Sequence, residues 1–261
     1  MNRRLIQPED AGIPDIFHAF SADAAVYDSS CSAAARVFFL DKGPGYYLKR
    51  TKKGSLQKEA ELTRFFHKKG MGTEVLAYES LDHDWLLTRR VPGEDCTFRM
   101  YLEDPEKLCD TLGTLLRQLH ETDPSGCPVP DRTADYLATA RRNYLADAYD
   151  KQQFPDNWGY ATAEEAWCVI EECGKYLHTD TLLHGDYCLP NIMLDDWHLS
   201  GFIDLDGAGV GDRHVDLFWG IWSLQFNLKT DRYRDRFLDA YGREDIQEEL
   251  FRVIGAIEVF G

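Results

Sequence analysis

The residue pattern of this 261-residue chain changes near residues 88–93, and this change limits the folds open to it. Before it, short runs rich in β-branched and aromatic side chains alternate with Gly and Pro, which is typical of strands and turns. After it, apolar residues recur at the three- and four-residue spacing of helices. The pattern predicts an α+β protein with a hinge at about 88–93, joining a small β-rich lobe over 1–91 to a larger, mainly helical lobe over 92–261.

The first third is predicted to contain a β-hairpin, a helix and a second pair of strands. Two β-prone runs are separated by a short segment whose Gly and Pro residues suit a turn. Gly70 follows an apolar stripe of helical spacing and favours a helix end there. The predicted elements are strands over 36–40, 46–50, 75–78 and 85–88 and a helix over 57–69.

The remaining two thirds are predicted to be mainly helical. Asp104 followed by Pro105 is a typical helix start, and a stripe of leucines follows it. Thr162 and Glu165 form a capping box, which marks the start of another helix. The predicted elements are helices from 104 to about 120, from 162 onward and over 230–241, with strands and loops over 182–210.

The charge balance argues against a polyanionic partner. The chain has 29 Lys and Arg against 45 Asp and Glu, a formal net charge of −16. Such a chain repels the phosphates of nucleic acids and of anionic membranes, so neither is an expected partner. The excess is uneven, since residues 1–92 carry a net charge of +2 and residues 93–261 a net charge of −18.

Cysteine usage and hydropathy predict a cytoplasmic protein that does not enter a membrane. The seven cysteines are an odd set without a C-x-x-C pair, so neither a zinc site nor a complete disulfide framework is indicated. The first ten residues lack a signal-peptide segment, and the longest uncharged apolar run, over 217–228, is too short to span a bilayer. The sequence leaves the oligomeric state open between a monomer and a weak dimer.

The densest group of polar residues is the segment 184–191, followed by 202–206. Asp186 and Asn191 lie five residues apart, and Asp204 follows after a stretch that could form a hairpin. Two carboxylates and an amide oxygen suit Mg²⁺ together with substrate phosphates, and an aspartate free of the metal could accept a proton from a hydroxyl. The alternative is that these residues only form a turn and a loop, and their spacing alone does not decide between the two.

Lys49 and Glu59 are candidates for a second polar site in the first lobe. Lys49 lies in a predicted strand and Glu59 near the start of the next helix, so an ion pair could hold the ammonium against ATP phosphates. The chain has no G-x-x-x-x-G-K-[ST] motif, and residues 29–35 offer Ser, Cys and Ala where a kinase glycine-rich loop would be. Nearby charges compete for the two roles: Lys52, Lys53 and Glu61.

Motifs spread over nearly the whole chain occur in a distinctive order. The most specific is the block from His-Gly-Asp at 184–186 to Phe-Ile-Asp at 202–204. In this order the chain resembles the aminoglycoside 3'-phosphotransferases, a family of protein-kinase-like antibiotic kinases. The motifs that carry the resemblance lie at 47–49, 56–60, 84–93, 119–128, 184–193, 200–204, 211–216 and 235–242.

The resemblance implies a two-lobed protein-kinase-like fold with MgATP in the cleft. Asp186 would be the catalytic base, and Asn191 and Asp204 would ligate Mg²⁺. Lys49 would reach the α- and β-phosphates and would be held by Glu59.

The resemblance also assigns the adenine site. The backbones at Arg89 and Val91 would hydrogen-bond adenine, while Tyr47 and Ile203 would cover its faces. Ser32 falls in the segment matching the loop over the phosphates. For Tyr47 and Ile203, plain core packing is the alternative.

A buried aspartate is implied to support the catalytic loop. Asp216 matches that position, so its role would be structural. His120 and His184 are predicted to be core or loop histidines with satisfied hydrogen bonds, not ligands.

The substrate side matches the family less closely. Aminoglycosides are polycations, and the family surrounds them with carboxylates. Asp156 and Asn157 match an acidic substrate loop, Glu258 matches one member of a C-terminal acidic pair, and Phe260 matches the usual terminal aromatic residue. The positions that depart from the family are Ile257, the Phe-Asn pair at 226–227 and the Asp-Gly pair at 206–207.

Two accounts of the acceptor follow. In the predicted one, Asp206 compensates for the missing acids, and the chain is an ATP-dependent phosphotransferase acting on an aminoglycoside hydroxyl, most simply the 3' one, which confers resistance. In the other, a more apolar pocket accepts another hydroxylated small molecule. A third reading is a nucleotide-binding protein without transfer activity. The side chains of the apolar pocket would be Trp219, Trp222, Phe226 and Ile257.

Overall fold

The computed structural model describes residues 3–31, 35–150 and 158–261. The chain forms two compact units, which are described separately. The first unit comprises Met1–Cys96 and Pro190–Asp206, and the second comprises Thr97–Leu189 and Gly207–Gly261. Within the described residues, no helix is long and apolar enough to cross a membrane.

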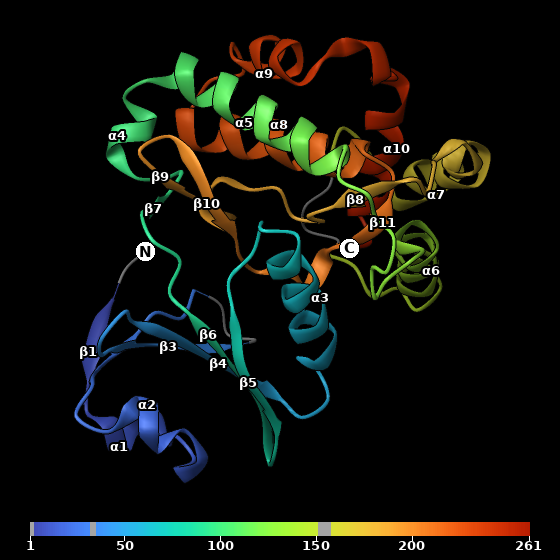
Figure 1. Ribbon diagram of the computed structural model, residues 1–261. Coiled ribbons are helices and arrows are strands. Elements are labelled where there is room, and N and C mark those ends of the chain that lie inside the picture. The colour runs from blue at the N-terminus through green and yellow to red at the C-terminus, as the bar shows by residue number, and fades with distance from the viewer. Residues whose placement is uncertain (1–2, 32–34, 151–157) are drawn as a thin grey trace. The chain divides into compact units, whose positions relative to one another are not determined.

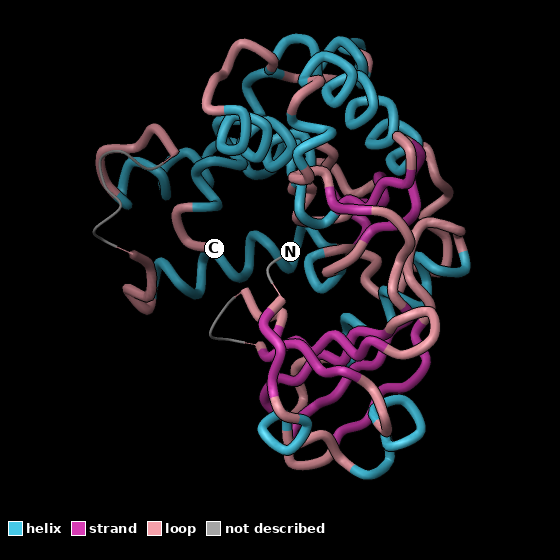
Figure 2. The backbone as a smooth tube through the Cα atoms, turned by 90° about the vertical axis from the view of Figure 1, so that its left-hand side faces the viewer, coloured by secondary structure: helices cyan, strands magenta, loops and turns pink. Residues whose placement is uncertain are grey.

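A six-stranded antiparallel sheet forms the centre of the first unit (Figures 1 and 2). Its strand order is β1-β2-β3-β4-β6-β5. The predicted hairpin is its middle, since β3 pairs antiparallel with β4. The predicted second pair is also present, since β5 pairs with β6. The strands are β1 (Arg4–Ile6), β2 (Ala25–Asp28), β3 (Arg36–Asp41), β4 (Tyr46–Lys52), β5 (Val75–Ser80) and β6 (His83–Arg89).

Helices cover both faces of this sheet because β6 is apolar on both sides. Trp85 and Leu87 pack into one cluster with residues from α1 and η1, whereas Leu86 between them packs with Ala60 of α3. Alternate residues of a strand point to opposite faces, so these two clusters lie on opposite sides of the sheet. The helices are α1 (Pro8–Ala11), η1 (Asp15–Phe17), α2 (His18–Ser21) and α3 (Gln57–Lys68), the last close to its predicted bounds.

A second, three-stranded sheet brings a late segment of the chain into the first unit. β9 (Ile192–Asp195) pairs with β10 (His198–Phe202) and with β7 (Glu94–Asp95). The Phe202 N–H also donates to the Met71 carbonyl at 2.7 Å. The sequence prediction assigned all of 92–261 to the second lobe, whereas these long-range hydrogen bonds group 190–206 with the first unit.

The second unit is mainly helical. α5 packs along α9 and contacts α8 (Figure 1). Gly113 permits this close approach, since a Cβ there would lie 2.7 Å from the Phe237 carbonyl oxygen. The helices are α4 (Arg99–Leu102), α5 (Pro105–His120), α6 (Arg132–Leu145), α7 (Ala163–Cys173), η3 (Gly174–Tyr176), α8 (His214–Leu228), α9 (Arg234–Tyr241), η6 (Arg243–Asp245) and α10 (Glu248–Glu258).

Short elements complete the chain around the polar segments. β8 (Thr181–Leu183) pairs antiparallel with β11 (Gly209–Gly211) in the second unit. Two 3-10 turns, η4 (Leu189–Asn191) and η5 (Leu205–Gly207), lie where the chain passes from one unit to the other. The predicted mixture of strands and loops over 182–210 is confirmed.

Two of the predicted helix starts are confirmed and one is displaced. Asp104 accepts a hydrogen bond from the Lys107 N–H, and Thr162 accepts one from the Glu165 N–H. The helix predicted from 230 begins only at Arg234. The reason is that α8 runs to Leu228 and ends at Lys229 in the left-handed conformation, with φ of 58°, so a turn must precede α9.

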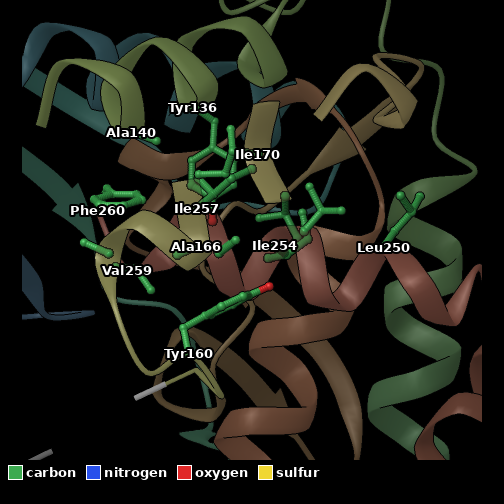
Figure 3. Packing of buried hydrophobic residues seen from close by; sticks show 14 of the residues in the cluster. Tyr136, Ala140, Tyr160, Ala166, Ile170, Leu250, Ile254, Ile257, Val259 and Phe260 are labelled. Carbon is green, nitrogen blue, oxygen red and sulfur yellow. The ribbon is translucent and has the colours of Figure 1, made fainter. Parts of the chain in front are cut away.

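A core cluster of the second unit joins α6, α7 and α10 (Figure 3). Ile257 and Phe260 are both fully buried in it, among Tyr136, Ile170 and Ile254. Ile257 is therefore a core residue and does not line an open pocket, which corrects that part of the second account of the acceptor.

Candidate active site

Residues predicted to bind nucleotide and metal gather around one cavity of about 550 Å³ in the first unit. The cavity is lined from strands β3, β4 and β6, from helix α3, from the segment after β6 and from the 190–206 segment. Every described residue of the predicted nucleotide and metal sites lines it: Tyr47, Lys49, Glu59, Arg89, Val91, Asn191, Ile203 and Asp204. Ser32 lies outside the described residues.

An ion-pair cluster lies in this cavity. Lys49 projects from β4, and its Nζ lies 2.8 and 3.0 Å from the two carboxylate oxygens of Glu59 in the first turn of α3. The same Nζ lies 2.7 Å from Oδ1 of Asp204. Burial alone would lower the pKa of Lys49, but the two carboxylates outweigh it and raise the pKa above its ordinary value. The cavity therefore contains a permanent ammonium.

Glu59 is the buried member of this cluster and Asp204 the accessible one. The Glu59 side chain is 7% exposed, and burial raises its pKa despite the attraction of Lys49. Asp204 is 51% exposed and has a left-handed backbone, with φ of 60°. Such a conformation is uncommon for a residue with a side chain and is frequent at functional sites. Asp204 is thus the carboxylate of this cluster that a ligand can reach.

Asn191 and Asp204 provide oxygen donors from adjoining segments. The Ile203 N–H, one residue before Asp204, donates to the Asn191 carbonyl at 3.0 Å. A carboxylate and an amide oxygen are ligands that Mg²⁺ accepts, with phosphates and water completing its shell. Within the described residues there is no cluster of three His, Cys, Asp or Glu able to hold a metal unaided. The donor set fits a metal that arrives with a phosphate ligand.

The segment after β6 presents main-chain groups at the cavity. The Arg89 N–H donates to the Glu74 carbonyl at 2.9 Å, and the Arg89 carbonyl accepts from the Thr73 hydroxyl. A carbonyl oxygen can accept a second hydrogen bond. Within the described residues, the Val91 N–H has no main-chain acceptor. These groups form a donor and acceptor edge of the kind that a planar base can pair with.

Tyr47 and Ile203 are half-buried residues of the cavity lining, not of the closed core. A further cation, which belongs to no motif of the sequence, lies beside Tyr47. Arg3 donates to the Tyr47 hydroxyl at 2.6 Å, and its guanidinium lies 3.7 Å from the centroid of the Phe39 ring. Arg3 also lines the cavity.

The predicted catalytic aspartate lies in the second unit, on a loop that follows β8. Asp216, fully buried at the start of α8, accepts hydrogen bonds from the His184 and Gly185 N–H groups, both at 2.7 Å. Gly185 has φ of 83°, and a Cβ there would lie 1.9 Å from the Gly207 carbonyl oxygen. The backbone just before Asp186 is therefore fixed by two charge-assisted hydrogen bonds and a close main-chain contact.

A chain of hydrogen bonds from Tyr241 through His120 holds the Asp216 carboxylate in place. His120 Nε2 lies 3.2 Å from Oδ2 of Asp216, and His120 Nδ1 lies 2.9 Å from the Tyr241 hydroxyl. Burial lowers the pKa of His120, so the ring is neutral. The tautomer that satisfies both contacts donates from Nε2 to Asp216 and accepts from Tyr241. Tyr241 lies in the motif at 235–242, but nothing in the sequence pairs it with His120, which lies 121 residues earlier.

The loop that carries Asp186 is also attached to α8. The Leu189 N–H donates to Oγ of buried Ser223 at 2.9 Å, and the Cys188 thiol lies 3.9 Å from the Trp219 carbonyl oxygen. Burial raises the pKa of Cys188 beyond the physiological range, so this thiol stays protonated. The loop thus contacts the turn of α8 that carries Trp219 and Ser223.

The residues predicted to contact substrate differ in how far they are exposed to solvent. Asp206 is exposed. Glu258 is half-buried, and its Oε1 accepts hydrogen bonds from the Tyr136 hydroxyl and from Trp219 Nε1. Burial raises the pKa of Glu258. Phe260 lies in the core of the unit. Asp156 and Asn157 lie outside the described residues.

The chain belongs to the phosphotransferase enzyme family, whose model matches residues 30–251. It is 47% identical over 249 residues to the probable aminoglycoside 3'-phosphotransferase of Lactococcus lactis, covering 95% of each chain. It is 30% identical over 177 residues to the aminoglycoside 3'-phosphotransferase of Niallia circulans, covering 68% of this chain and 67% of the relative. The resemblance found in the sequence is confirmed.

Solved structures agree on the fold. An aminoglycoside-3'-phosphotransferase of type VIII superposes with a TM-score of 0.75 at 24% identity, over 91% of this chain and 94% of the other. The aminoglycoside phosphotransferase APH(3'')-Id from Streptomyces rimosus, in complex with ADP and streptomycin, gives a TM-score of 0.75 at 21% identity, over 98% and 99%. The predicted α+β, protein-kinase-like fold is therefore confirmed.

Proposed function

We propose that the protein transfers the γ-phosphoryl group of ATP to the 3'-hydroxyl of an aminoglycoside antibiotic and so confers resistance. The substrate and the position are those in the names of its relatives. The observation that carries the proposal is the cavity in which Lys49 is paired with Glu59 and Asp204. An ammonium fixed beside carboxylates in a cavity suits phosphates. The proposed place of action is the cytoplasm, and the seven cysteines, all free, support it.

ATP would bind through residues of the first-unit cavity. The Arg89 carbonyl and the Val91 N–H would pair with the adenine edge, with Tyr47 and Ile203 over its faces. Lys49 would contact the α- and β-phosphates, oriented by Glu59. Ser32 is proposed to contribute at the phosphates on the strength of the resemblance alone.

Mg²⁺ is the metal proposed to act with ATP, and Asn191 and Asp204 would hold it. Their amide and carboxylate oxygens suit a hard cation that retains water and phosphate ligands. When bound, Mg²⁺ would neutralise negative charge on the phosphates. Lys49 would supply the protein's own positive charge for the same purpose.

Asp186 would act as the general base. It would orient the acceptor hydroxyl and take its proton while the hydroxyl oxygen bonds to the γ-phosphorus. The bond from that phosphorus to the β,γ-bridging oxygen breaks, and ADP leaves with the electron pair. Because Asp216 holds the loop backbone at His184 and Gly185, little reorganisation of Asp186 is needed during the reaction.

Carboxylates would attract the cationic acceptor. Exposed Asp206 is proposed to meet an ammonium group, as are Asp156 and Asn157 on the resemblance alone. The net charge of −18 over residues 93–261 would steer a polycation toward the protein. Glu258 would not contact the acceptor directly but would orient the Trp219 indole that donates to it. Phe260 would contribute only by packing in the core.

Replacing Asp186 with Ala tests the proposal. We expect kcat with kanamycin and ATP to fall by about 10²–10⁴-fold, the usual contribution of a general base, with ATP affinity little changed. ADP release and the mass of the product measure the turnover. Asp231→Ala is the matched control, since Asp231 is an exposed aspartate of the same unit, and it should leave kcat unchanged. Near-normal phosphorylation by Asp186→Ala would overturn the assignment.

A second candidate is a kinase for another small hydroxylated molecule. The observation favouring it is the exposure of Trp222 and Phe226 on α8. An ADP-release screen across aminoglycosides, macrolides and amino alcohols separates the two functions. Turnover only outside the aminoglycosides would establish the second function, and MgATP binding without any phosphorylated product would establish a protein without transfer activity.

A further inference from the structure

A groove of about 820 Å³ lies between helices α6 and α7 of the second unit, and no residue assigned above to nucleotide, metal or acceptor lines it. The two helices run antiparallel. At one end of the groove, a Cβ on Gly174 would lie 3.3 Å from Leu137, and at the other, Tyr144 stacks on Trp167 with ring centroids 4.6 Å apart. The lining residues are Leu137, Ala138, Arg141, Arg142, Leu145, Ala146, Trp167, Ile170, Glu171, Gly174 and Lys175.

The floor of this groove is apolar and its length matches a short helix. Ile170 and Gly174 are buried beneath it, whereas Leu145 at its rim is 70% exposed. Leu137, Arg141 and Leu145 follow one another at four-residue spacing, so they share a face of α6. Eight residues of helix span about 12 Å, or roughly two turns. An apolar groove between two helices is a surface on which a third helix commonly docks.

The rim of the groove is basic, although the unit around it is acidic. Arg141, Arg142 and Lys175 are exposed along it, against the single carboxylate of Glu171. Residues 93–261 as a whole carry a net charge of −18. Across 3–31, 35–150 and 158–261, none of the three cations forms an ion pair with a carboxylate, and Arg142 contacts only the Thr139 hydroxyl, at 3.4 Å.

Other arginines of this unit are held by carboxylates. Arg236 on α9, for example, pairs with both Glu106 and Asp110 on α5. The cations of the groove therefore differ from these arginines, since their charges are available to carboxylates of another molecule.

The spacing of the charges indicates the shape of the molecule that would cover the groove. Lys175 lies at the end near Leu137, and Arg141 and Arg142 lie about one helical turn further along, before Leu145. A fatty acid has a single carboxylate at one end and requires a cation only there. Cations spread along both helices instead match carboxylates that flank an apolar stripe along its length, which is the pattern of an acidic amphipathic helix.

We propose that the groove between α6 and α7 is a docking surface for an acidic amphipathic helix of a partner protein. Apolar side chains of that helix, at three- and four-residue spacing, pack on Leu137 and Ile170. Its carboxylates pair with Arg141, Arg142 and Lys175. The apolar contacts supply affinity and the charges select the partner. This inference goes beyond the proposed function and does not depend on it.

Peptide binding to the full-length protein tests the groove. The probe is a synthetic helical peptide with a leucine stripe flanked by glutamates, and its control is a scrambled peptide of the same composition. Because the chain carries a net charge of −16, it repels an acidic peptide as a whole, so binding requires a local basic surface. We expect the ordered peptide to bind at least about 10-fold more tightly than the scrambled one. Ordered peptides with isoleucine and phenylalanine stripes extend the test to other apolar side chains.

Variants of the groove separate its two components. Arg141→Glu with Arg142→Glu should weaken binding of the ordered peptide at least about 10-fold, and Leu145→Gln about 3- to 10-fold. The matched control is Lys229→Glu with Arg232→Glu, which makes the same change in net charge at exposed positions outside the groove and should change the affinity by less than about twofold. Thermal unfolding of each variant checks that the fold is kept.

Trp167 in the groove reports where the peptide binds. The peptide should change the tryptophan fluorescence of the wild-type protein but not of Trp167→Phe, in which calorimetry should still detect binding. Failure of all three ordered peptides to bind would overturn the inference, as would an equal loss of affinity in the control variant. A dimer that Arg141→Glu with Arg142→Glu dissociates would assign the groove to a second copy instead. A fluorescence response to dodecanoate, without one to any peptide, would assign it to a lipid.

Discussion

The two units differ in the chemistry of the surfaces that they present. In the first, a buried Lys49–Glu59 pair and accessible Asp204 line a cavity of about 550 Å³. In the second, the face of α8 that adjoins the catalytic loop is uncharged and aromatic. A triphosphate presents the same charges in every reaction and requires fixed cations.

Among the variants that test this difference between the units, Lys49→Ala is expected to have the largest effect. Loss of the ammonium that is proposed to contact the phosphates should lower kcat/KM for ATP by about 10²–10³-fold, as is typical when one electrostatic contact to the reacting group is removed. Steady-state kinetics give the loss, and kanamycin binding followed by fluorescence should be unchanged. Lys52→Ala, an exposed lysine on the same strand, is the control. If acceptor binding fell equally, the two chemistries would not be separable.

Gly185→Ala should damage the loop that carries Asp186 without altering the first-unit cavity. A Cβ there meets the Gly207 carbonyl at 1.9 Å, and φ of 83° is unfavourable for Ala. We expect a loss of at least about 3 kcal/mol in the free energy of unfolding of the second unit, or an equivalent fall in kcat if the loop shifts instead. Denaturant titration measures the free energy of unfolding, and steady-state kinetics measure kcat. Gly126→Ala, at φ of 81° with open space around it, controls for backbone strain alone.

Asp84→Asn tests how the first unit holds its ion pair. Burial would raise the pKa of Asp84, but hydrogen bonds from Leu56, Ser80 and Tyr78 lower it to about 2. Leu56 precedes α3, which carries Glu59. From this pKa shift we expect Asp84→Asn to lose about 2 kcal/mol of unfolding free energy at pH 7.

The sign of the pH dependence follows from the lowered pKa of Asp84. Its stabilisation is fully present above its unfolded value of 3.8 and is lost as the pH falls toward about 2. The stability difference between the wild-type protein and Asp84→Asn should therefore shrink between pH 4 and pH 2. Denaturant titrations over this range measure it, and a difference that stayed constant would contradict the assignment. The Lys49–Glu59 pair should survive, so activity should change by less than about threefold.

The smallest expected effect is that of salt on acceptor turnover. The net charge of −18 over residues 93–261 should steer a polycation, and added salt screens this attraction. We expect kcat/KM for kanamycin to fall a few-fold between about 0.05 and 0.5 M salt, through association more than through the bound pose. A kcat/KM that did not change with salt concentration would show that the net charge does not steer the acceptor.

Much of the first unit could be predicted from the sequence because its signals are local. The hairpin of β3 and β4, the helix α3 and the pair of β5 and β6 follow from turn residues and periodicity. Lys49 and Glu59 lie ten residues apart, so a strand followed by a helix brings them within reach of each other. Their roles in catalysis stay predictions.

The acceptor side could be predicted less well because its contacts join distant segments. Ile257 and Phe226 are both apolar, yet one is fully buried and the other is 55% exposed. Glu258 matched an acidic substrate position, yet its carboxylate accepts from Tyr136, 122 residues earlier, and from Trp219. Periodicity identifies an apolar helix face but does not say whether a partner covers it.

The sequence by itself determined the class of fold, the order of its motifs and the residue types available for binding a nucleotide. Only the tertiary structure decided that the 190–206 segment joins the first unit, that His120 and Tyr241 support Asp216, and that α8 leaves two aromatic rings uncovered. The reason is physical. Local structure depends on dihedral preference and apolar spacing within a few residues, whereas burial and hydrogen-bond partners depend on which distant segments pack together.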